Sequence, residues 1–250
     1  MIDIKMSDDI AVVTLAYGKA NALDTELCDA LVKAFAELRA SGARAVIVTG
    51  QGKIFSAGVD LVRLDREGAD YVRRFLPALH RLYEAVFFHP KPVIAAVNGH
   101  AIAGGAVLAC CADRRIMANG GGRIGITELL VGVPFPALAF EVLRFAMPPC
   151  HLSELMFTAA ICPADVALQK GWVDEVVEPD ALMDRALAVA QQYAELSPVA
   201  FAQTKKQLRQ PVADRFATDG KATDEAVTDI WAAPQTLRHI NDYVAKTLRK

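Results

Sequence analysis

Residues Asn98 to Ile116 read NGHAIAGGAVLACCADRRI. The stretch is rich in glycine and alanine, and such small side chains let another part of the chain or a ligand come close to the backbone. It holds no carboxylate before Asp113, and Val107 stands at its centre. An enzyme usually needs an acid or a base near so open a backbone, so the stretch raises the question of which residue would supply it.

Strand-like and helix-like segments alternate around this stretch. Short runs rich in β-branched residues predict a strand at Ile10–Ala16 and buried strands at Ala43–Gly50 and Lys91–Gly99, and a short strand is expected at Asp113–Ala118. Helical spacing of apolar residues predicts a helix from Asp24 or Thr25 to Gly42, one or two helices within Leu61–His89, and a small-residue helix at Ala103–Ala112. The order is typical of an α/β domain with a mostly buried sheet.

The pattern changes after Ile126. Helical segments are predicted at Pro136–Thr158, at Pro163–Gly171, and from Pro198 onward with Ser197 as the cap. One more strand is predicted at Trp172–Glu178, and only helices are expected from Asp180 to Lys250. We expect the last helices to pack on the core or on a neighbouring subunit.

Composition narrows the class of partner. The 250 residues are 53% hydrophobic, so the chain can form a sizeable core, and the net charge of -2 argues against a basic nucleic-acid surface. Apolar runs stay below the roughly 18 residues that cross a bilayer, and the acidic start, MIDIKMSDDI, is unlike a signal peptide. We therefore expect a cytoplasmic protein whose partners are small molecules or copies of itself, without nucleic acid or membrane.

Five cysteines are present and no C-x-x-C pair occurs. Their apolar neighbours predict buried, reduced thiols, and the histidines are too scattered for a zinc site, so we expect no metal centre. The five are Cys28, Cys110, Cys111, Cys150 and Cys162.

Two predicted strands are followed by glycine-rich turns, Phe55–Asp60 and Asn98–Ala106. Ligands gather beyond the carboxyl ends of strands in open α/β sheets, and backbone N–H groups there suit an oxyanion such as an enolate oxygen. The glycines could equally serve only tight turns and close packing. A G-x-G-x-x-G fingerprint and a P-loop are both absent, which argues against a dinucleotide or a nucleoside triphosphate.

Five blocks between Lys19 and Val177 resemble the crotonase (enoyl-CoA hydratase/isomerase) family. They are KANALD, GKIFSAGVDL, KPVIAAVNGHAIAGGAVLACCAD, IGITELLVGVP and ADVALQKGWVDEVV. The resemblance implies a spiral of β-β-α units over residues 1–195 and a C-terminal helical region over 196–250 that is used in oligomer packing. It also implies a homotrimer or a dimer of trimers that acts on acyl-CoA thioesters, with coenzyme A as part of the substrate and no further cofactor.

The resemblance places two backbone donors for the thioester oxygen. They are the N–H groups of Val59 and Gly104, and neither role needs a side chain. The family has a run of three glycines that reads Ala103-Gly104-Gly105 here, a mild change provided that Ala103 has ordinary backbone angles.

The resemblance also implies that coenzyme A lies along the first loop, at Ser56, Ala57, Asp60, Leu61 and Arg63. Arg63 or Lys53 would meet a phosphate, although each could be an ordinary surface charge. Asp60 could instead make a hydrogen bond that fixes the loop. Apolar residues of Leu61–His89 would line the acyl chain or simply pack in the core; they are Phe75, Leu76, Leu79, Tyr83 and Phe87.

The family's hydratases use two glutamates, and this chain keeps one of them. Val107 replaces the first, whereas Glu128 matches the second. Pro136 stands where a backbone N–H helps to seat water in hydratases, and proline has none to donate. The bulky Phe135, Leu138 and Phe140 are expected to dry the pocket. An apolar wall from Val107 and Phe135 is expected to raise the pKa of Glu128.

This pattern is most similar to the family's 3,2-enoyl-CoA isomerases. Glu128 alone would remove an α-proton from a 3-enoyl-CoA and return it at the γ-carbon, with the charge held at Val59 and Gly104. Three alternatives remain open. They are an atypical hydratase, another thioester reaction such as hydrolysis on the same site, and a non-catalytic acyl-CoA-binding protein.

Overall fold

The strands form two sheets in the computed structural model, which describes residues 1–247. The larger sheet has the order β1-β2-β3-β5-β7-β10. Its neighbouring strands pair in parallel, except for the antiparallel pair β1 and β2. Its strands are β1 (Ile2–Ser7), β2 (Ile10–Leu15), β3 (Ala45–Gly50), β5 (Val93–Val97), β7 (Arg114–Ala118) and β10 (Glu175–Val177). The smaller sheet holds β4 (Ile54–Ser56), β6 (His100–Ile102), β8 (Arg123–Gly125) and β9 (Ile161–Pro163).

Helices occupy most of the rest of the described chain. They are α1 (Thr25–Ala40), α2 (Leu61–Phe87), α3 (Gly104–Cys110), α4 (Glu128–Val131), α5 (Ala137–Ala146), α6 (Pro149–Thr158), α7 (Ala164–Lys170), η1 (Pro179–Ala181), α8 (Leu182–Ala194), α9 (Pro198–Arg215), η2 (Phe216–Gly220), α10 (Lys221–Ala232) and α11 (Pro234–Thr247). From Asp180 to Thr247 the chain forms no strand, as expected, and the expectation for residues 248–250 lies outside the described residues.

The chain moves from the large sheet to the small sheet and then into a helix, three times. The three units are β3-β4-α2, β5-β6-α3 and β7-β8-α4. The predicted α/β spiral of β-β-α units is therefore confirmed. The strands of the smaller sheet were not predicted, because three residues are too few to show a period of two in the sequence. The first glycine-rich turn thus begins within β4, and the second contains β6.

The predicted starts of two helices agree with their N-caps, whereas α1 ends at Ala40 with Ser41 as its cap and not at Gly42. The Asp24 side chain accepts a hydrogen bond from the Leu27 N–H at the start of α1, and the Ser197 side chain accepts one from Ala200 at the start of α9. A cap of this kind contributes about 1 kcal/mol. The Leu61–His89 region forms α2, which bends at Gly68, where φ is 68° and ψ is -150°. Two helical pieces therefore meet there.

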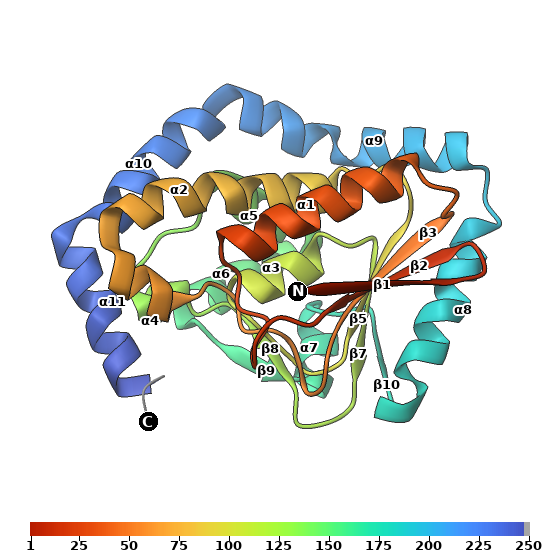
Figure 1. Ribbon diagram of the computed structural model, residues 1–250, viewed down its shortest axis with the longest axis horizontal. Coiled ribbons are helices and arrows are strands. Elements are labelled where there is room, and N and C mark those ends of the chain that lie inside the picture. Colours follow the sequence, from red (N-terminus) through yellow and green to blue (C-terminus); the bar gives the residue numbers. More distant parts are fainter. Residues whose placement is uncertain (248–250) are drawn as a thin grey trace.

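Helices cover both faces of the large sheet (Figure 1). On one face, α8 packs its apolar side against β2, β3, β5 and β7. On the other, the main core joins α1, α2 and α3 to the sheet. The apolar residues expected at an acyl wall, from Phe75 to Phe87, are all buried in this core.

The C-terminal helices pack on the chain's own core. In Figure 1 they run from α9 and α10 above α2 to α11 beside α4, and α10 and α11 both contact α2. The Trp231 Nε1–H donates to the Pro134 carbonyl at 2.8 Å, and the His239 ring lies 3.2 Å from the Leu130 carbonyl. A boundary at residue 196 and a role of this region in oligomer packing stay predictions.

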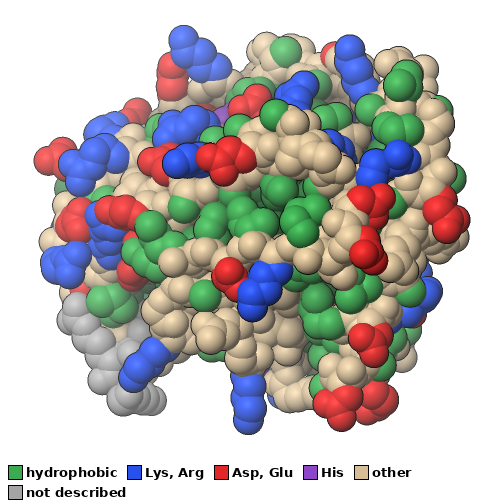
Figure 2. All heavy atoms as spheres, turned by 45° about the vertical axis from the view of Figure 1, so that its right-hand side comes forward, with side chains coloured by type: hydrophobic (Ala, Val, Ile, Leu, Met, Phe, Trp, Pro, Cys, Tyr) green, Lys and Arg blue, Asp and Glu red, His purple; other side chains and the backbone are tan. Residues whose placement is uncertain are grey.

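The surface mixes both signs of charge. Figure 2 shows Lys and Arg side chains interleaved with Asp and Glu around exposed hydrophobic side chains. Cys150 lies on this protein's exposed surface, so the expectation that all five cysteines are buried is wrong at that position. It stands in the first turn of α6, a helix with few buried residues. Within residues 1–247, no helix is long and apolar enough to cross a membrane.

Candidate active site

Three parallel strands of the smaller sheet end at one edge. β4 pairs with β6 and β6 pairs with β8, so their carboxyl ends lie side by side. Val59 follows the end of β4, Gly104 follows β6 and Glu128 follows β8, each within three residues. The edge beyond parallel strand ends is where ligands bind in such sheets. The three predicted catalytic residues are therefore brought to one place by strand pairing.

The loops carrying Val59 and Gly104 touch through their backbones. A side-chain carbon on Gly58 would lie 2.9 Å from the Gly104 nitrogen, and Gly58 has a φ of 80° that favours glycine. A side-chain carbon on Gly105 would lie 2.3 Å from the Ser56 carbonyl oxygen. The small residues thus allow the start of α3 to press against the first loop.

Both predicted donors lack a partner in the described part of the protein. Among residues 1–247, neither the Val59 N–H nor the Gly104 N–H donates to a protein acceptor. Neighbouring bonds fix the backbone around Val59, since the Leu23 N–H donates to Gly58 at 2.7 Å and the Asp60 N–H donates to Leu23 at 2.9 Å. Gly104 is the first residue of α3, where N–H groups have no partner within the helix. The pair can stabilise a developing oxyanion.

Ala103 does not have ordinary backbone angles, which overturns the condition stated for this substitution. Its φ is 51° and its ψ is -125°, a region that residues with a side chain rarely adopt. Such a conformation costs on the order of 1–3 kcal/mol and persists only when the surroundings impose it. Here the Ala103 N–H donates to Gly125 at 2.8 Å, and its carbonyl accepts from Ala106 at 2.9 Å.

Glu128 is buried with one oxygen unpaired. It is 8% exposed, and its Oε2 has no hydrogen-bond partner among the described residues. Burial raises the pKa of Glu128 to about 7, against an ordinary value of 4.5, although the backbone near Thr127 and Glu128 partly opposes the shift. The predicted direction is confirmed. A carboxyl that titrates near neutral pH can both accept and donate a proton there.

Val107 is 1% exposed and lies within α3, so no titratable group stands at the position of the missing glutamate. Pro136 caps the start of α5, and Leu138 is buried. Phe135 and Phe140 are half-buried and line a cavity of about 570 Å³ that also includes Leu129, the neighbour of Glu128.

The first loop is held by hydrogen bonds within the protein. The Ser56 hydroxyl donates to the Asn21 carbonyl at 2.8 Å and accepts from the Gly58 N–H at 3.2 Å. Asp60 caps α2 by accepting from the Arg63 N–H at 2.9 Å, which is the loop-fixing role left open for it. Ala57 is exposed and Leu61 is half-buried, so both can contact a ligand.

Arg63 already has three carboxylate partners. Its guanidinium bonds to Asp24 at 3.2 Å, to Glu67 at 2.9 Å and to Glu26. The bond to Glu26 is the main cause that raises the pKa of Arg63, and it lowers the pKa of Glu26 to about 2. The Arg63 side chain stays partly exposed, so a ligand can still reach it.

Sequence reasoning missed how two residues, Asn21 and Tyr83, shape the site. The Asn21 side chain donates to the carbonyls of Ile54 and Phe55 at 3.1 and 3.2 Å, which anchors β4. The Tyr83 hydroxyl donates to the Gly104 carbonyl at 3.0 Å. A polar ring within an apolar helix face was the available signal for Tyr83, but its partner could not be known without the fold.

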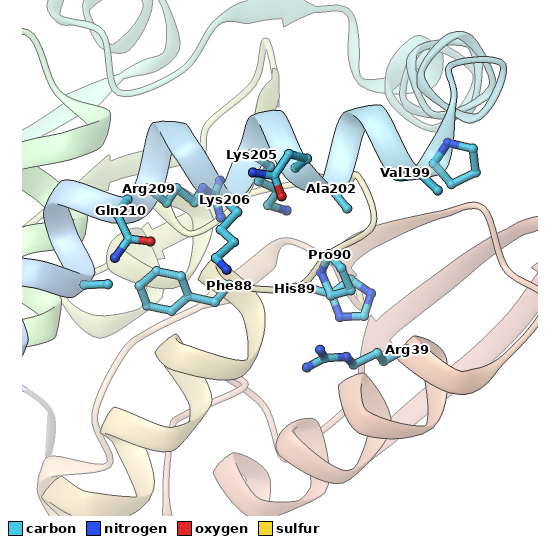
Figure 3. A pocket seen from close by; sticks show the side chains of 13 residues that line it. Arg39, Phe88, His89, Pro90, Val199, Ala202, Lys205, Lys206, Arg209 and Gln210 are labelled. Atoms are coloured by element: carbon cyan, nitrogen blue, oxygen red, sulfur yellow. The ribbon is translucent and has the colours of Figure 1, made fainter.

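A second cluster of charged residues is structural. Figure 3 shows Lys205 and Arg209 of α9 across a cavity of about 820 Å³ from His89 and Arg39. Lys205 and Arg209 are almost fully buried and bond to Asp113 at 2.6 and 2.7 Å. The cluster ties α9 to the start of β7.

Comparisons with known proteins agree with this geometry. A sequence model of the enoyl-CoA hydratase/isomerase family matches residues 5–246. The chain belongs to this family.

Family members resemble the chain in sequence and in fold. A Thermus thermophilus protein with an enoyl-CoA hydratase name is 37% identical over 194 residues, which is 76% of each chain. A crystal structure of an enoyl-CoA hydratase from Mycobacterium ulcerans has a TM-score of 0.84 at 28% identity, covering 92% of this chain and 99% of that one. Human mitochondrial delta3-delta2-enoyl-CoA isomerase has a TM-score of 0.93 at 24% identity, covering 98% and 97%. The fold is therefore the crotonase fold, and the family acts on acyl-CoA thioesters.

The pKa of Glu128 predicts a pH-dependent stability. Between about pH 4.5 and 7 the unfolded chain loses the Glu128 proton while the folded chain keeps it, so the folded state loses stability as the pH rises. The Glu128→Gln side chain cannot ionise. The free energy of unfolding of this variant, minus that of wild type, should therefore be about 3 kcal/mol larger at pH 8 than at pH 4.5. Urea unfolding at both values measures this. Glu84→Gln, on an exposed part of α2, is the control, and a Glu128→Gln difference that is constant with pH contradicts the prediction.

Proposed function

We propose that the protein is an acyl-CoA isomerase that shifts a double bond from position 3 to position 2. The observation that carries the proposal is the buried carboxyl of Glu128, which has an unpaired oxygen and a pKa of about 7. Two unpaired N–H groups on the neighbouring strand ends support it.

In the first step, the Glu128 carboxylate removes a proton from C2 of a 3-enoyl-CoA. The electron pair of that C–H bond moves into a dienolate, whose oxygen is held by the N–H groups of Val59 and Gly104. In the second step, the protonated Glu128 returns the proton to C4, and the double bond now joins C2 and C3. One residue therefore acts as base and then as acid, and the protein needs no further cofactor.

Hydration is less suited to this site. Adding water to a 2-enoyl thioester needs a base for the water and a proton source for the α-carbon, for which the family's hydratases use two carboxylates. Val107 offers neither an acid nor a hydrogen bond to water, and it is buried among apolar residues. The hydratase names of several relatives nevertheless favour hydration as the second candidate.

Coenzyme A would lie along the first loop. Ala57 and Leu61 offer accessible surface, and Ser56 and Asp60 hold the backbone that the thioester arm would follow. Arg63 would add a charge-assisted hydrogen bond to a phosphate while it stays paired with Glu67. The chain would act as a homotrimer or a dimer of trimers, as is implied by the resemblance to its family.

Glu128→Gln should abolish isomerisation of a 3-enoyl-CoA, because the amide cannot accept the C2 proton. Binding of the thioester should survive, since the two N–H donors belong to the backbone. A spectrophotometric assay and calorimetric titration with a saturated acyl-CoA measure the two properties. Full isomerase activity in this variant would contradict the proposed mechanism.

Wild-type protein should hydrate crotonyl-CoA at least a hundredfold more slowly than it isomerises a 3-enoyl-CoA, the order of rate that a missing general acid–base group costs. The two assays are run side by side on one preparation. A hydration rate equal to the isomerisation rate would favour the second candidate instead.

Arg63→Met should raise the KM for a CoA thioester about tenfold, the equivalent of one charge-assisted hydrogen bond. The KM for the matching pantetheine thioester, which lacks the nucleotide phosphates, should change little. Arg66→Met, in the same helix and more exposed, is the matched control. Equal KM increases for the two thioesters would show that Arg63 only supports the fold.

A further inference from the structure

Tyr83 places a hydroxyl deep in an apolar region. Its ring is 1% exposed, and its neighbours along α2, Leu79, Leu82 and Val86, are buried hydrophobic residues. Phenylalanine would fill nearly the same volume without burying an oxygen, and a buried hydroxyl is costly unless it is hydrogen-bonded. The hydroxyl donates to the Gly104 carbonyl at 3.0 Å, so it binds the residue that supplies the second oxyanion donor.

Tyr83 also occupies the space beside the Gly104 backbone where a side chain would lie. A side-chain carbon on Gly104 would lie 2.8 Å from the Tyr83 hydroxyl oxygen and 3.2 Å from Leu23. Gly104 has no side chain of its own that could lock its backbone, so these neighbours and its carbonyl partner hold it in place.

The strained residue before Gly104 makes such holding necessary. Ala103 has a φ of 51° and a ψ of -125°, and rotation of its ψ toward the ordinary left-handed region would relieve the strain. That rotation also turns the Gly104 N–H, because the Ala103 carbonyl and the Gly104 N–H belong to the same planar peptide group. Unless Gly104 compensates fully, its carbonyl also moves away from the Tyr83 hydroxyl. Bonds from Ala106 and Val107 to the Ala103 carbonyl oppose the same rotation.

We propose that Tyr83 is a positioning residue, whose hydroxyl holds Gly104 so that its N–H stays directed at the thioester oxygen despite the strain at Ala103. The proposal rests on the proposed function only in so far as a thioester oxygen occupies this site. In this proposal, a side chain of α2 controls the orientation of an N–H donor that belongs to the backbone of α3.

Proton transfer by Tyr83 fits these contacts poorly. Its proton is directed to the Gly104 carbonyl, and burial raises the pKa of Tyr83 well above its usual value, with the charge of Glu128 as a smaller contribution. The hydroxyl therefore stays a neutral donor throughout the range in which Glu128 titrates.

The test is Tyr83→Phe with a reporter that needs no turnover. Butyryl-CoA labelled with ¹³C at the thioester carbonyl is bound to the protein, and its chemical shift reports how strongly the two N–H groups polarise that bond. Wild type should move the resonance downfield, and Tyr83→Phe should lose a large part of that movement. Isomerisation should fall about tenfold in kcat with less than a twofold change in KM, the equivalent of one hydrogen bond lost in the transition state.

The second variant is Ala103→Gly combined with Tyr83→Phe. Glycine removes the strain at position 103, so the double variant should recover most of the carbonyl movement and of kcat that Tyr83→Phe loses. A residue that only supports packing would give additive losses. The control is Tyr71→Phe, which removes a hydroxyl from an equally buried side chain of α2. The Tyr71 hydroxyl accepts from the Thr25 N–H at 3.3 Å, so this variant should keep the wild-type carbonyl resonance.

The outcomes separate the two proposals. Tyr83→Phe with the wild-type resonance and kcat overturns the role of Tyr83, as does a double variant no better than Tyr83→Phe alone. A wild type that polarises the carbonyl without isomerising a 3-enoyl-CoA contradicts the proposed reaction, and the resonance of Tyr83→Phe still decides the role of Tyr83. A wild type that leaves the carbonyl resonance of bound ligand unmoved overturns both.

Discussion

The pairing of three short parallel strands is the constraint on which the site depends. β4, β6 and β8 bring Val59, Gly104 and Glu128 to one edge, although these residues lie far apart in the sequence. The start of α3 can approach β4 only because Gly105 has no side chain, since a side-chain carbon there would lie 2.3 Å from the Ser56 carbonyl oxygen. The helices around the three strands fix the backbone that the proposed reaction would use.

Burial of Glu128 links the fold to the proposed chemistry. Removing a carboxylate from water without a partner for Oε2 destabilises its charged form, so the proton binds more tightly and the pKa moves to about 7. The same burial would keep water away from a carbanion-like intermediate. The strain at Ala103 is also imposed by the fold. The surrounding hydrogen bonds maintain a peptide orientation that the isolated chain would avoid.

Much of this arrangement could be predicted from the residues. Helical periodicity and capping residues marked α1 and α9, and the glycine-rich turns together with the family resemblance placed Val59, Gly104 and Glu128. The three-residue strands escaped detection because they are shorter than a readable period. The φ of Ala103, the carboxylates around Arg63 and the bond from Tyr83 depend on contacts between distant segments, which one sequence does not display.

The central claim, that one carboxylate carries the proton from C2 to C4, has a direct test. A 3-enoyl-CoA with deuterium in place of both C2 hydrogens is incubated with the protein in ordinary water. The reaction is stopped when only a small fraction of the substrate has been converted, and the product is examined by NMR. Transfer by Glu128 in a buried site predicts that much of the removed deuterium reappears at C4. Product that carries only protium at C4 at the earliest times, or that carries a hydroxyl at C3, would contradict the account.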